Sequence, residues 1–225
     1  CASLPSVAAG AATPSPSGGA AAPDAERKQV TVMFADIAGF TAMSERMDPE
    51  EVSDLMKACF AMMEKIIEEH GGTIDKFMGD CVMALFGAPQ ALEDAPHRAI
   101  ETALEIRRRL QGFNEERRLT TPLKIHIGIN TGPVIAGLMG GDKRQDFTVM
   151  GDTVNLASRM EGVAETGDIL VAEDTFRLTE GYFDFAPVGE VQVKGKAQPV
   201  KAWKVLGPRR IITRIDTGHA KGLSP

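Results

Sequence analysis

The sequence is 225 residues long, with 43% hydrophobic and 25% charged residues, which suits one soluble globular domain of about 180 residues with tails. The formal net charge of −6 argues against an electrostatic binder of nucleic acid, and no apolar run approaches the roughly 20 residues that a membrane span needs. The three cysteines, Cys1, Cys59 and Cys81, are odd in number and far apart, which favours a reducing, cytoplasmic compartment over a disulfide framework.

Both ends of the chain are predicted to be connectors. Residues 1–26 are almost entirely Ala, Pro, Ser and Gly, a composition that cannot bury enough apolar surface to offset the entropy lost on ordering. We expect a disordered linker there, one folded domain over residues 27–207 and a second connector over residues 208–225. Because the chain begins with a cysteine rather than a methionine, we expect it to be a piece of a longer protein with flanking domains.

The folded part is predicted to open with a strand over residues 29–36, followed by a glycine turn with the sequence IAGFT. A long helix is indicated next by Asp48 at the N-cap, Pro49 at the first helical position and Glu51 closing a capping box. Apolar residues then recur at helical spacing until Gly71 and its neighbour end the helix. The residues expected to face inward are Val52, Leu55, Met56, Cys59, Phe60, Met63, Ile66 and Ile67.

The stretch over residues 73–86 predicts a β-hairpin, because two apolar runs meet at Gly79 and Asp80. Most acid–glycine turns are ordinary surface loops. This turn, however, carries the carboxylate of Asp80, and the strand before it carries the ammonium group of Lys76. A second carboxylate, Asp36, ends the strand that precedes the glycine turn. Two strand-end aspartates beside a glycine turn suit a hard divalent cation and a triphosphate.

The rest of the sequence predicts one more long helix, a pair of strands, a short helix and three final strands. Their order indicates an α+β sandwich with the helices on one face of a mainly antiparallel sheet. Residues 140–146 are expected to be a connection between late strands. The expected bounds are about 94–114 for the long helix, 123–132 and 133–140 for the paired strands, 152–163 for the short helix, and 168–171, 182–188 and 199–206 for the last strands.

Four motifs give the sequence a family resemblance, which runs from about residue 28 to residue 206. They are FADIAGFT, DKFMGD, IGINTGPVIAGLMG and FTVMGDTVNLASRM, in this order. Together they resemble the catalytic domain of the class III nucleotidyl cyclases. The resemblance implies a ferredoxin-like βαββαβ core with extra C-terminal strands, working as a head-to-tail homodimer. It also implies conversion of a nucleoside triphosphate to its 3′,5′-cyclic monophosphate and pyrophosphate, with two Mg²⁺ or Mn²⁺ ions.

The resemblance implies a metal site on the first strand and the hairpin turn. Asp36 and Asp80 match the family's two metal-binding aspartates, with the carbonyl of Ile37 as a further ligand. Helix capping by Asp36 is the alternative that the sequence leaves open. Backbone amides at a glycine turn that leads into a helix can cradle the β- and γ-phosphates. The residues implied to do so are Gly39, Phe40 and Thr41.

Three residues in the second half of the sequence match catalytic and triphosphate positions. Asn155 and Arg159 are four residues apart and so share one helix face, a spacing that alone would indicate a solvated surface. The resemblance implies that the asparagine orients the ribose and that the arginine stabilises charge on the pentacoordinate phosphorus. Lys194 matches the lysine that reaches the triphosphate, with Lys196 as a possible substitute; without the resemblance both would be exposed charges.

Two positions are implied to recognise the base. Lys76 matches the lysine that donates to adenine N1, and Thr148 stands where many adenylyl cyclases have aspartate. A threonine hydroxyl can accept from the adenine amino group. Guanylyl cyclases typically have glutamate and cysteine at these positions, so ATP is the better substrate candidate than GTP. Threonine also occurs in the subgroup that includes bicarbonate-responsive enzymes, which makes bicarbonate a candidate activator.

Alternatives remain for the function and for one residue. The chain could accept GTP or both nucleotides, or it could be a catalytically silent module that dimerises or senses nucleotides. His126 stands where several relatives have a phosphate-binding arginine, so a γ-phosphate contact from that position is in doubt. A histidine in a strand is more often simply packed.

Overall fold

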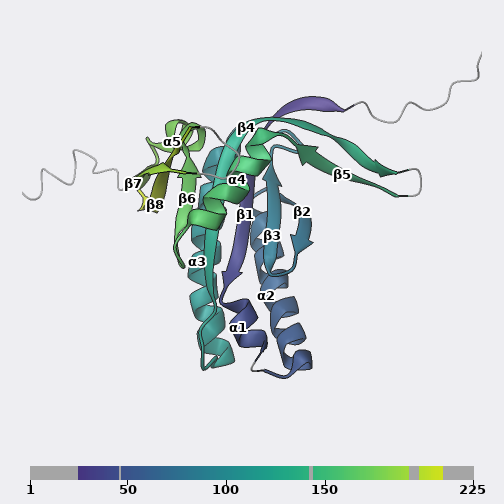
Figure 1. The fold of residues 1–225 in the computed structure, drawn as a ribbon, viewed down its shortest axis with the longest axis vertical. Helices are drawn as coiled ribbons and strands as arrows, with labels where there is room; N and C mark the ends of the chain where they lie inside the picture. Colours follow the sequence, from purple (N-terminus) through teal and green to yellow (C-terminus); the bar gives the residue numbers. More distant parts are fainter. Residues whose placement is uncertain (1–24, 46, 142–143, 193–197, 210–225) are drawn as a thin grey trace, which may run out of the picture.

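A computed structural model of the chain describes residues 25–45, 47–141, 144–192 and 198–209 (Figure 1). Two residues assigned above to the triphosphate, Lys194 and Lys196, lie outside the described residues. Most of the linker predicted over residues 1–26 and most of the connector predicted over 208–225 lie outside them as well. The first strand begins one residue before the predicted start of the domain.

Five helices and eight strands make up the described fold. Their bounds, in chain order, are β1 Glu26–Ala38, α1 Phe40–Ser44, α2 Pro49–Glu69, β2 Thr73–Met78, β3 Cys81–Phe86, α3 Ala95–Arg117, β4 Lys124–Gly141, β5 Arg144–Met150, α4 Asp152–Val163, β6 Ile169–Ala172, α5 Glu173–Thr179, β7 Phe183–Val191 and β8 Val200–Pro208.

The eight strands form one sheet, and the predicted α+β class is confirmed. The strand order is β2-β3-β1-β4-β6-β8-β7, and β5 pairs with β4 outside this path. All of these pairings are antiparallel except the parallel one between β4 and β6. None of the described helices is long and apolar enough to cross a membrane.

Helices α2 and α3 lie on one face of the sheet and cover the main core. The carboxylate of Asp48 caps α2 by accepting a hydrogen bond of 2.8 Å from the amide of Glu50. The helix ends before Gly71, whose φ of +79° favours glycine. The residues predicted to face inward are buried, apart from Phe60, which is half-buried and packs against Phe77. The capping and periodicity signals therefore predicted α2 correctly.

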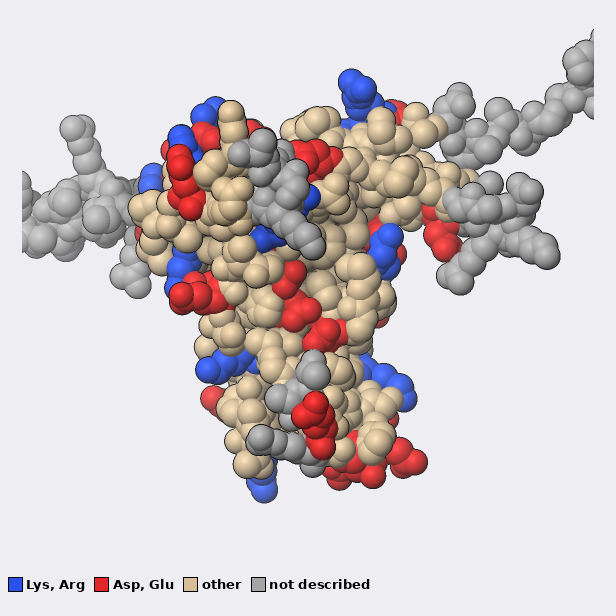
Figure 2. Space-filling view, viewed as in Figure 1, with Lys and Arg blue, Asp and Glu red and all other residues tan. Residues whose placement is uncertain are grey.

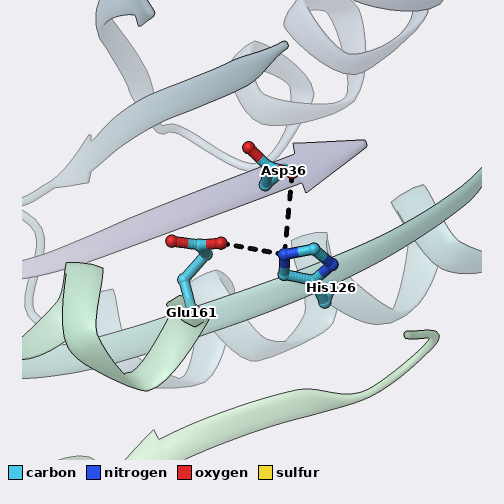
Figure 3. Close-up of side chains that lie close together, drawn as sticks. All are labelled: Asp36, His126 and Glu161. Carbon is cyan, nitrogen blue, oxygen red and sulfur yellow. Dashed lines mark ion pairs between the residues drawn. The ribbon is translucent and has the colours of Figure 1, made fainter. Parts of the chain in front are cut away.

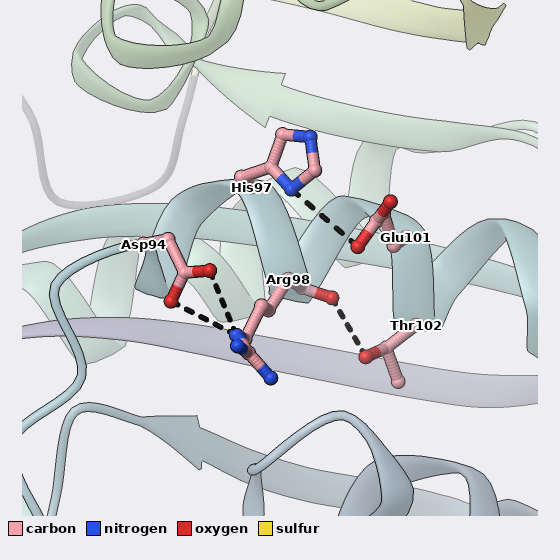
Figure 4. Close-up of polar contacts among 5 residues, drawn as sticks. All are labelled: Asp94, His97, Arg98, Glu101 and Thr102. Carbon is pink, nitrogen blue, oxygen red and sulfur yellow. Dashed lines mark hydrogen bonds and ion pairs between the residues drawn. The ribbon is translucent and has the colours of Figure 1, made fainter.

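Helix α3 begins with a set of contacts between neighbouring turns (Figure 4). Both carboxylate oxygens of Asp94 accept from Nε of Arg98 at 2.9 Å, and His97 lies 3.4 Å from a carboxylate oxygen of Glu101. The buried hydroxyl of Thr102 donates to the carbonyl of Arg98 at 2.7 Å. Contacts of this kind stabilise a helix locally by a few tenths of a kcal/mol each, so we assign this cluster no further role.

Helix α4 lies on the opposite face of the sheet, so the expectation that the helices share one face is wrong. Side chains of β1 alternate between two apolar clusters. Met33 and Ala35 belong to the core under α2 and α3, whereas Val32 and Phe34 belong to a second cluster that contains Ala157 of α4. The sheet is therefore covered on both faces, and α4 carries its residues to a separate surface.

Two glycines of β4 let α4 approach the sheet closely. A Cβ on Gly128 would clash with the backbone amide of Glu161, and one on Gly132 would lie 2.7 Å from the hydroxyl of Thr153. The same hydroxyl donates to the carbonyl of Pro133 at 2.8 Å. The buried amide of Asn130 donates to the carbonyl of Thr153 at 3.1 Å. The motif IGINTG thus fixes the position of α4, because any larger side chain at either glycine would displace it.

Strand β4 is continuous over 18 residues, which corrects the prediction that residues 123–132 pair with residues 133–140. Its whole length up to Ala136 pairs with β1, and its last part pairs with β5 in a hairpin that extends away from the rest of the sheet (Figure 1). Residues 140–146 were expected to be a connection. The described part of that stretch belongs instead to the ends of β4 and β5.

Candidate active site

Two carboxylates interact electrostatically where the pairing of β1 with β3 ends. Asp36 lies near the end of β1, and Asp80 lies in the turn between β2 and β3, where Gly79 has a φ of +68°. The amide of Ile37 donates to the carbonyl of Asp80 at 3.3 Å, which fixes the turn against the strand. Burial raises the pKa of Asp36, the negative charge of Asp80 raises it further, and His126 opposes both effects. A divalent cation would relieve this cost, so the pair fits a metal site.

A third carboxylate, Glu161 of α4, joins this site through His126 of β4 (Figure 3). Nε2 of His126 lies 2.9 Å from Oε1 of Glu161 and 3.6 Å from Oδ1 of Asp36. One ligand atom from each of the three residues lies within 4.8 Å of the others. Burial raises the pKa of Glu161, as does the charge of Asp36, whereas His126 lowers it. Acidic side chains also gather near the middle of the face that carries α4 (Figure 2).

The sequence did not single out Glu161, because a lone acid in a helix is usually solvated. The environment of His126 is neither the phosphate contact nor the simple packing in a strand that the sequence suggested. Its imidazole lies between two carboxylates, and its Nδ1 is buried without a hydrogen-bond partner among the described residues. Asp36 caps no helix, since it lies within β1 and pairs there with Cys81 and His126.

The glycine turn follows directly from Asp36 and Ile37. Gly39 has a φ of +79° and nothing lies within 4 Å of where its Cβ would be, so the backbone is open to a ligand there. The short helix α1 begins at Phe40 and includes the backbone of Thr41. Amide groups in the first turn of a helix have no partners within the helix. The three residues therefore lie where a phosphate group beside the two aspartates could meet them.

The two residues assigned to the base are in contact. Nζ of Lys76 on β2 donates to Oγ1 of Thr148 on β5 at 3.3 Å. They line an open cavity of about 590 Å³ together with Asp75, which the sequence did not single out. Its Oδ2 accepts from the Thr148 hydroxyl at 3.1 Å and lies 3.0 Å from Nζ of Lys76. Residues 72 positions apart are thus assembled into one polar group.

Asn155 and Arg159 lie on α4, the first exposed and the second half-buried. Among the described residues, no hydrogen bond or ion pair joins either side chain to Asp36 or Asp80. The structure of one chain therefore assembles two separate groups, the carboxylate site and the Lys76–Thr148 pair. Within the described part of the chain, neither group is bonded to the side chain of Asn155 or Arg159.

Residues 23–207 match the adenylate and guanylate cyclase catalytic domain family. The match covers most of the chain, and the chain belongs to this family. The resemblance inferred from the four motifs is confirmed.

Several known proteins are similar to the chain. It is 33% identical to adenylate cyclase 1 of Rhizobium meliloti over 86% of its own length and 30% of the relative's, so it spans under a third of that protein. The crystal structure of the adenylyl cyclase CyaB from P. aeruginosa aligns with a TM-score of 0.81 and 38% identity, covering 84% of this chain and all of that one. The guanylyl cyclase Cya2 aligns with a TM-score of 0.78 and 36% identity, covering 84% of this chain and 97% of that one.

Proposed function

We propose that the chain is the catalytic domain of an adenylyl cyclase, which converts ATP to 3′,5′-cyclic AMP and pyrophosphate. The observation that carries the choice of ATP is the contact between Lys76 and Thr148. An ammonium donor beside a hydroxyl that can accept is complementary to the N1 and amino group of adenine. The similarity to adenylyl cyclases over most of the chain supports the class of reaction.

Asp36, Asp80 and the carbonyl of Ile37 would hold two Mg²⁺ or Mn²⁺ ions. Bound there, the ions would lower the pKa of the ribose 3′-hydroxyl and neutralise charge on the leaving pyrophosphate. The pKa of Asp36 is raised first by burial and then by the charge of Asp80, and this supports the role because a bound cation would offset both effects. Amides of the glycine turn at Gly39, Phe40 and Thr41 would hold the β- and γ-phosphates.

The groups of α4 would act on the reacting atoms. Cyclisation requires the ribose 3′-oxygen to attack the α-phosphorus in line with the departing pyrophosphate. Asn155 would orient the ribose for this attack, and Arg159 would stabilise the charge that appears on the pentacoordinate phosphorus. Because that charge develops mainly in the transition state, Arg159 should govern kcat more than KM. Lys194, outside the described residues, would reach the triphosphate.

We propose a head-to-tail homodimer in which each active site takes residues from both chains. Asp36 and Asp80 of one chain would work with residues of the other, namely Lys76, Thr148, Asn155 and Arg159. The lack of any bond between the α4 residues and the two aspartates within the described part of one chain supports this arrangement. The compartment proposed is the cytoplasm, where ATP is present and where the free thiols of Cys59 and Cys81 would stay reduced.

A guanylyl or dual-specificity cyclase is the second candidate, since a guanylyl cyclase is among the similar structures. A silent module is the third. A cyclic-nucleotide assay with ATP and with GTP, each in Mg²⁺ and in Mn²⁺, separates the three. Production of cyclic AMP well above cyclic GMP is the expected result. Equal or greater production of cyclic GMP would overturn the ATP assignment, and no product from either nucleotide would overturn the cyclase assignment.

Bicarbonate is proposed as an activator on the presence of Thr148 alone. The test compares the cyclase rate in chloride and in bicarbonate at fixed pH and ionic strength. A higher rate in bicarbonate is expected. An unchanged rate would remove the proposal and leave the cyclase assignment standing.

A further inference from the structure

Asp75 and Lys76 are neighbours on β2, yet both contact Thr148. Consecutive residues of a regular strand point to opposite faces of the sheet. Here the pairing with β3 shifts between Ile74, which lies opposite Ala84, and Lys76, which lies opposite Met83. Asp75 is the extra residue of this β-bulge. Bulges re-aim side chains and occur often beside active sites, which explains how two consecutive residues reach the same hydroxyl.

The carboxylate of Asp75 is completely buried, whereas 46% of the Lys76 side chain is exposed. Its Oδ2 receives both available partners, the Thr148 hydroxyl and the Lys76 ammonium group. Its Oδ1 is buried without a hydrogen-bond partner among the described residues. A buried carboxylate with one unsatisfied oxygen is costly to keep. An exposed lysine such as Lys76 does not need a buried carboxylate to neutralise its charge. The burial of the Asp75 carboxylate therefore calls for a more specific role.

We infer that Asp75 is a positioning residue that makes Thr148 an acceptor toward the base and so selects a 6-aminopurine nucleoside triphosphate; this rests on the proposed function. A hydroxyl group has one proton to donate and two lone pairs. Thr148 gives its proton to Asp75 and receives one from Lys76, so a single lone pair remains. Lys76 uses two of its three protons on these partners, and one donor remains.

The remaining acceptor and donor distinguish purines by their Watson–Crick edge. Adenine presents an amino donor at position 6 and an acceptor at N1, which match Thr148 and Lys76 respectively. A 6-oxopurine in the same pose presents an acceptor at position 6 and an N1–H donor, so both contacts are mismatched. A threonine hydroxyl without Asp75 could rotate and donate to the 6-oxo group, and half of this discrimination would be lost.

The test compares two substitutions of Asp75 in the full chain. Asp75→Leu removes the acceptor and fills the same space with an apolar side chain. Asp75→Asn removes the charge and keeps an amide oxygen that can accept from Thr148. Measurements of kcat/KM with ATP, ITP and GTP give the ratio of ATP to 6-oxopurine use for each protein. Asp75→Ala serves as a second acceptor-free variant if the leucine variant does not fold by circular dichroism.

The acceptor-free variant is expected to lose about tenfold or more of the ATP-to-ITP ratio, because a buried polar group set against the wrong partner supplies discrimination of at least this size. Asp75→Asn is expected to keep the ratio within about threefold of the wild type, since its acceptor is retained. Equal losses with ATP, ITP and GTP in the acceptor-free variant would show a merely structural role and overturn the inference. Absence of cyclic nucleotide from the wild type would instead overturn the proposed function, and the inference with it.

Discussion

His126 on β4 and Glu161 on α4 are joined by a contact of 2.9 Å between Nε2 and Oε1, beside Asp36. The contact links the sheet to the helix that carries Asn155 and Arg159. It does not fully compensate the burial of Glu161, because the pKa of that carboxyl remains raised above its ordinary value. The site therefore holds negative charge that the fold alone does not stabilise.

Glu161→Gln should make the metal-free protein more stable at pH 7.5. A raised folded-state pKa means that wild-type Glu161 binds its proton more tightly when folded, so stability is lost as the pH rises through the folded pKa. Glutamine keeps a polar contact to His126 without the charge. We expect the Tm in EDTA to be higher for the variant than for the wild type. The difference should shrink toward zero as the pH falls below the unfolded pKa of 4.5. A lower Tm for the variant at pH 7.5 would contradict the direction of the shift.

Asp36→Ala and Asp80→Ala should each abolish cyclase activity while the protein stays folded. Asp36 lies near the end of β1 and Asp80 in the turn between β2 and β3, and neither side chain belongs to an apolar core cluster, so only the proposed metal site is lost. Cyclic AMP production is measured beside circular dichroism, with Asp54→Ala on the exposed surface of α2 as the control. Activity above a few per cent in either site variant would remove the two-metal assignment, and loss of the folded signal would indicate a structural role.

Lys76→Glu combined with Thr148→Cys should reduce kcat/KM for ATP by about a hundredfold or more. The proposed donor to N1 becomes an acceptor, and polar groups left mismatched in a site reject the wrong base by several kcal/mol. Efficient use of GTP need not follow, because the rest of the pocket also shapes the choice. The matched control is Lys65→Glu, a charge reversal on the exposed face of α2. Unchanged ATP turnover in the double variant would show that Lys76 does not recognise the base.

Cys59 and Cys81 should resist thiol reagents while the protein is folded. Burial raises the pKa of each thiol to about 12, so only about one in ten thousand would be ionised at pH 8. The measurement is reaction with DTNB on a Cys1→Ser variant. Two thiols should react in guanidinium chloride and none within minutes in native buffer. Rapid reaction of the native protein would show that one of these side chains is accessible.

Local sequence signals correctly predicted the elements whose turn or cap lies within or next to the element itself. The hairpin over β2 and β3 and the helix α2 each contain their own turn or cap, at Gly79 and Asp48, and both were found where expected. The pairing of β4 with β1 and β5 was missed, because strand partners depend on contacts far along the chain. The face chosen by α4 depends on Gly128 and Gly132, whose meaning appears only once the helix lies against them.

The candidate site shows the same division. The sequence singled out Asp36, Asp80 and Lys76 as candidates because each belongs to a short motif with a recognisable spacing. Asp75 and Glu161 were missed, because the role of each depends on a partner on another element. A single acid in a strand or a helix predicts nothing specific. The bulge that turns Asp75 toward Thr148 has no strong sequence signal, because neither Asp75 nor its two neighbours is a glycine or a proline.

The most direct test of a shared active site mixes two inactive variants, Asp36→Ala and Arg159→Ala. A two-fold dimer repeats every contact and so builds two equivalent composite sites. In a mixed dimer, both lesions fall in one site, and the other receives an intact aspartate pair and an intact arginine. Random exchange makes about half of the dimers mixed, with one of two sites active, so roughly a quarter of wild-type cyclic AMP production should return. A tagged pull-down confirms subunit exchange. No recovery of activity in an exchanged mixture would contradict the shared site and show that each chain works alone.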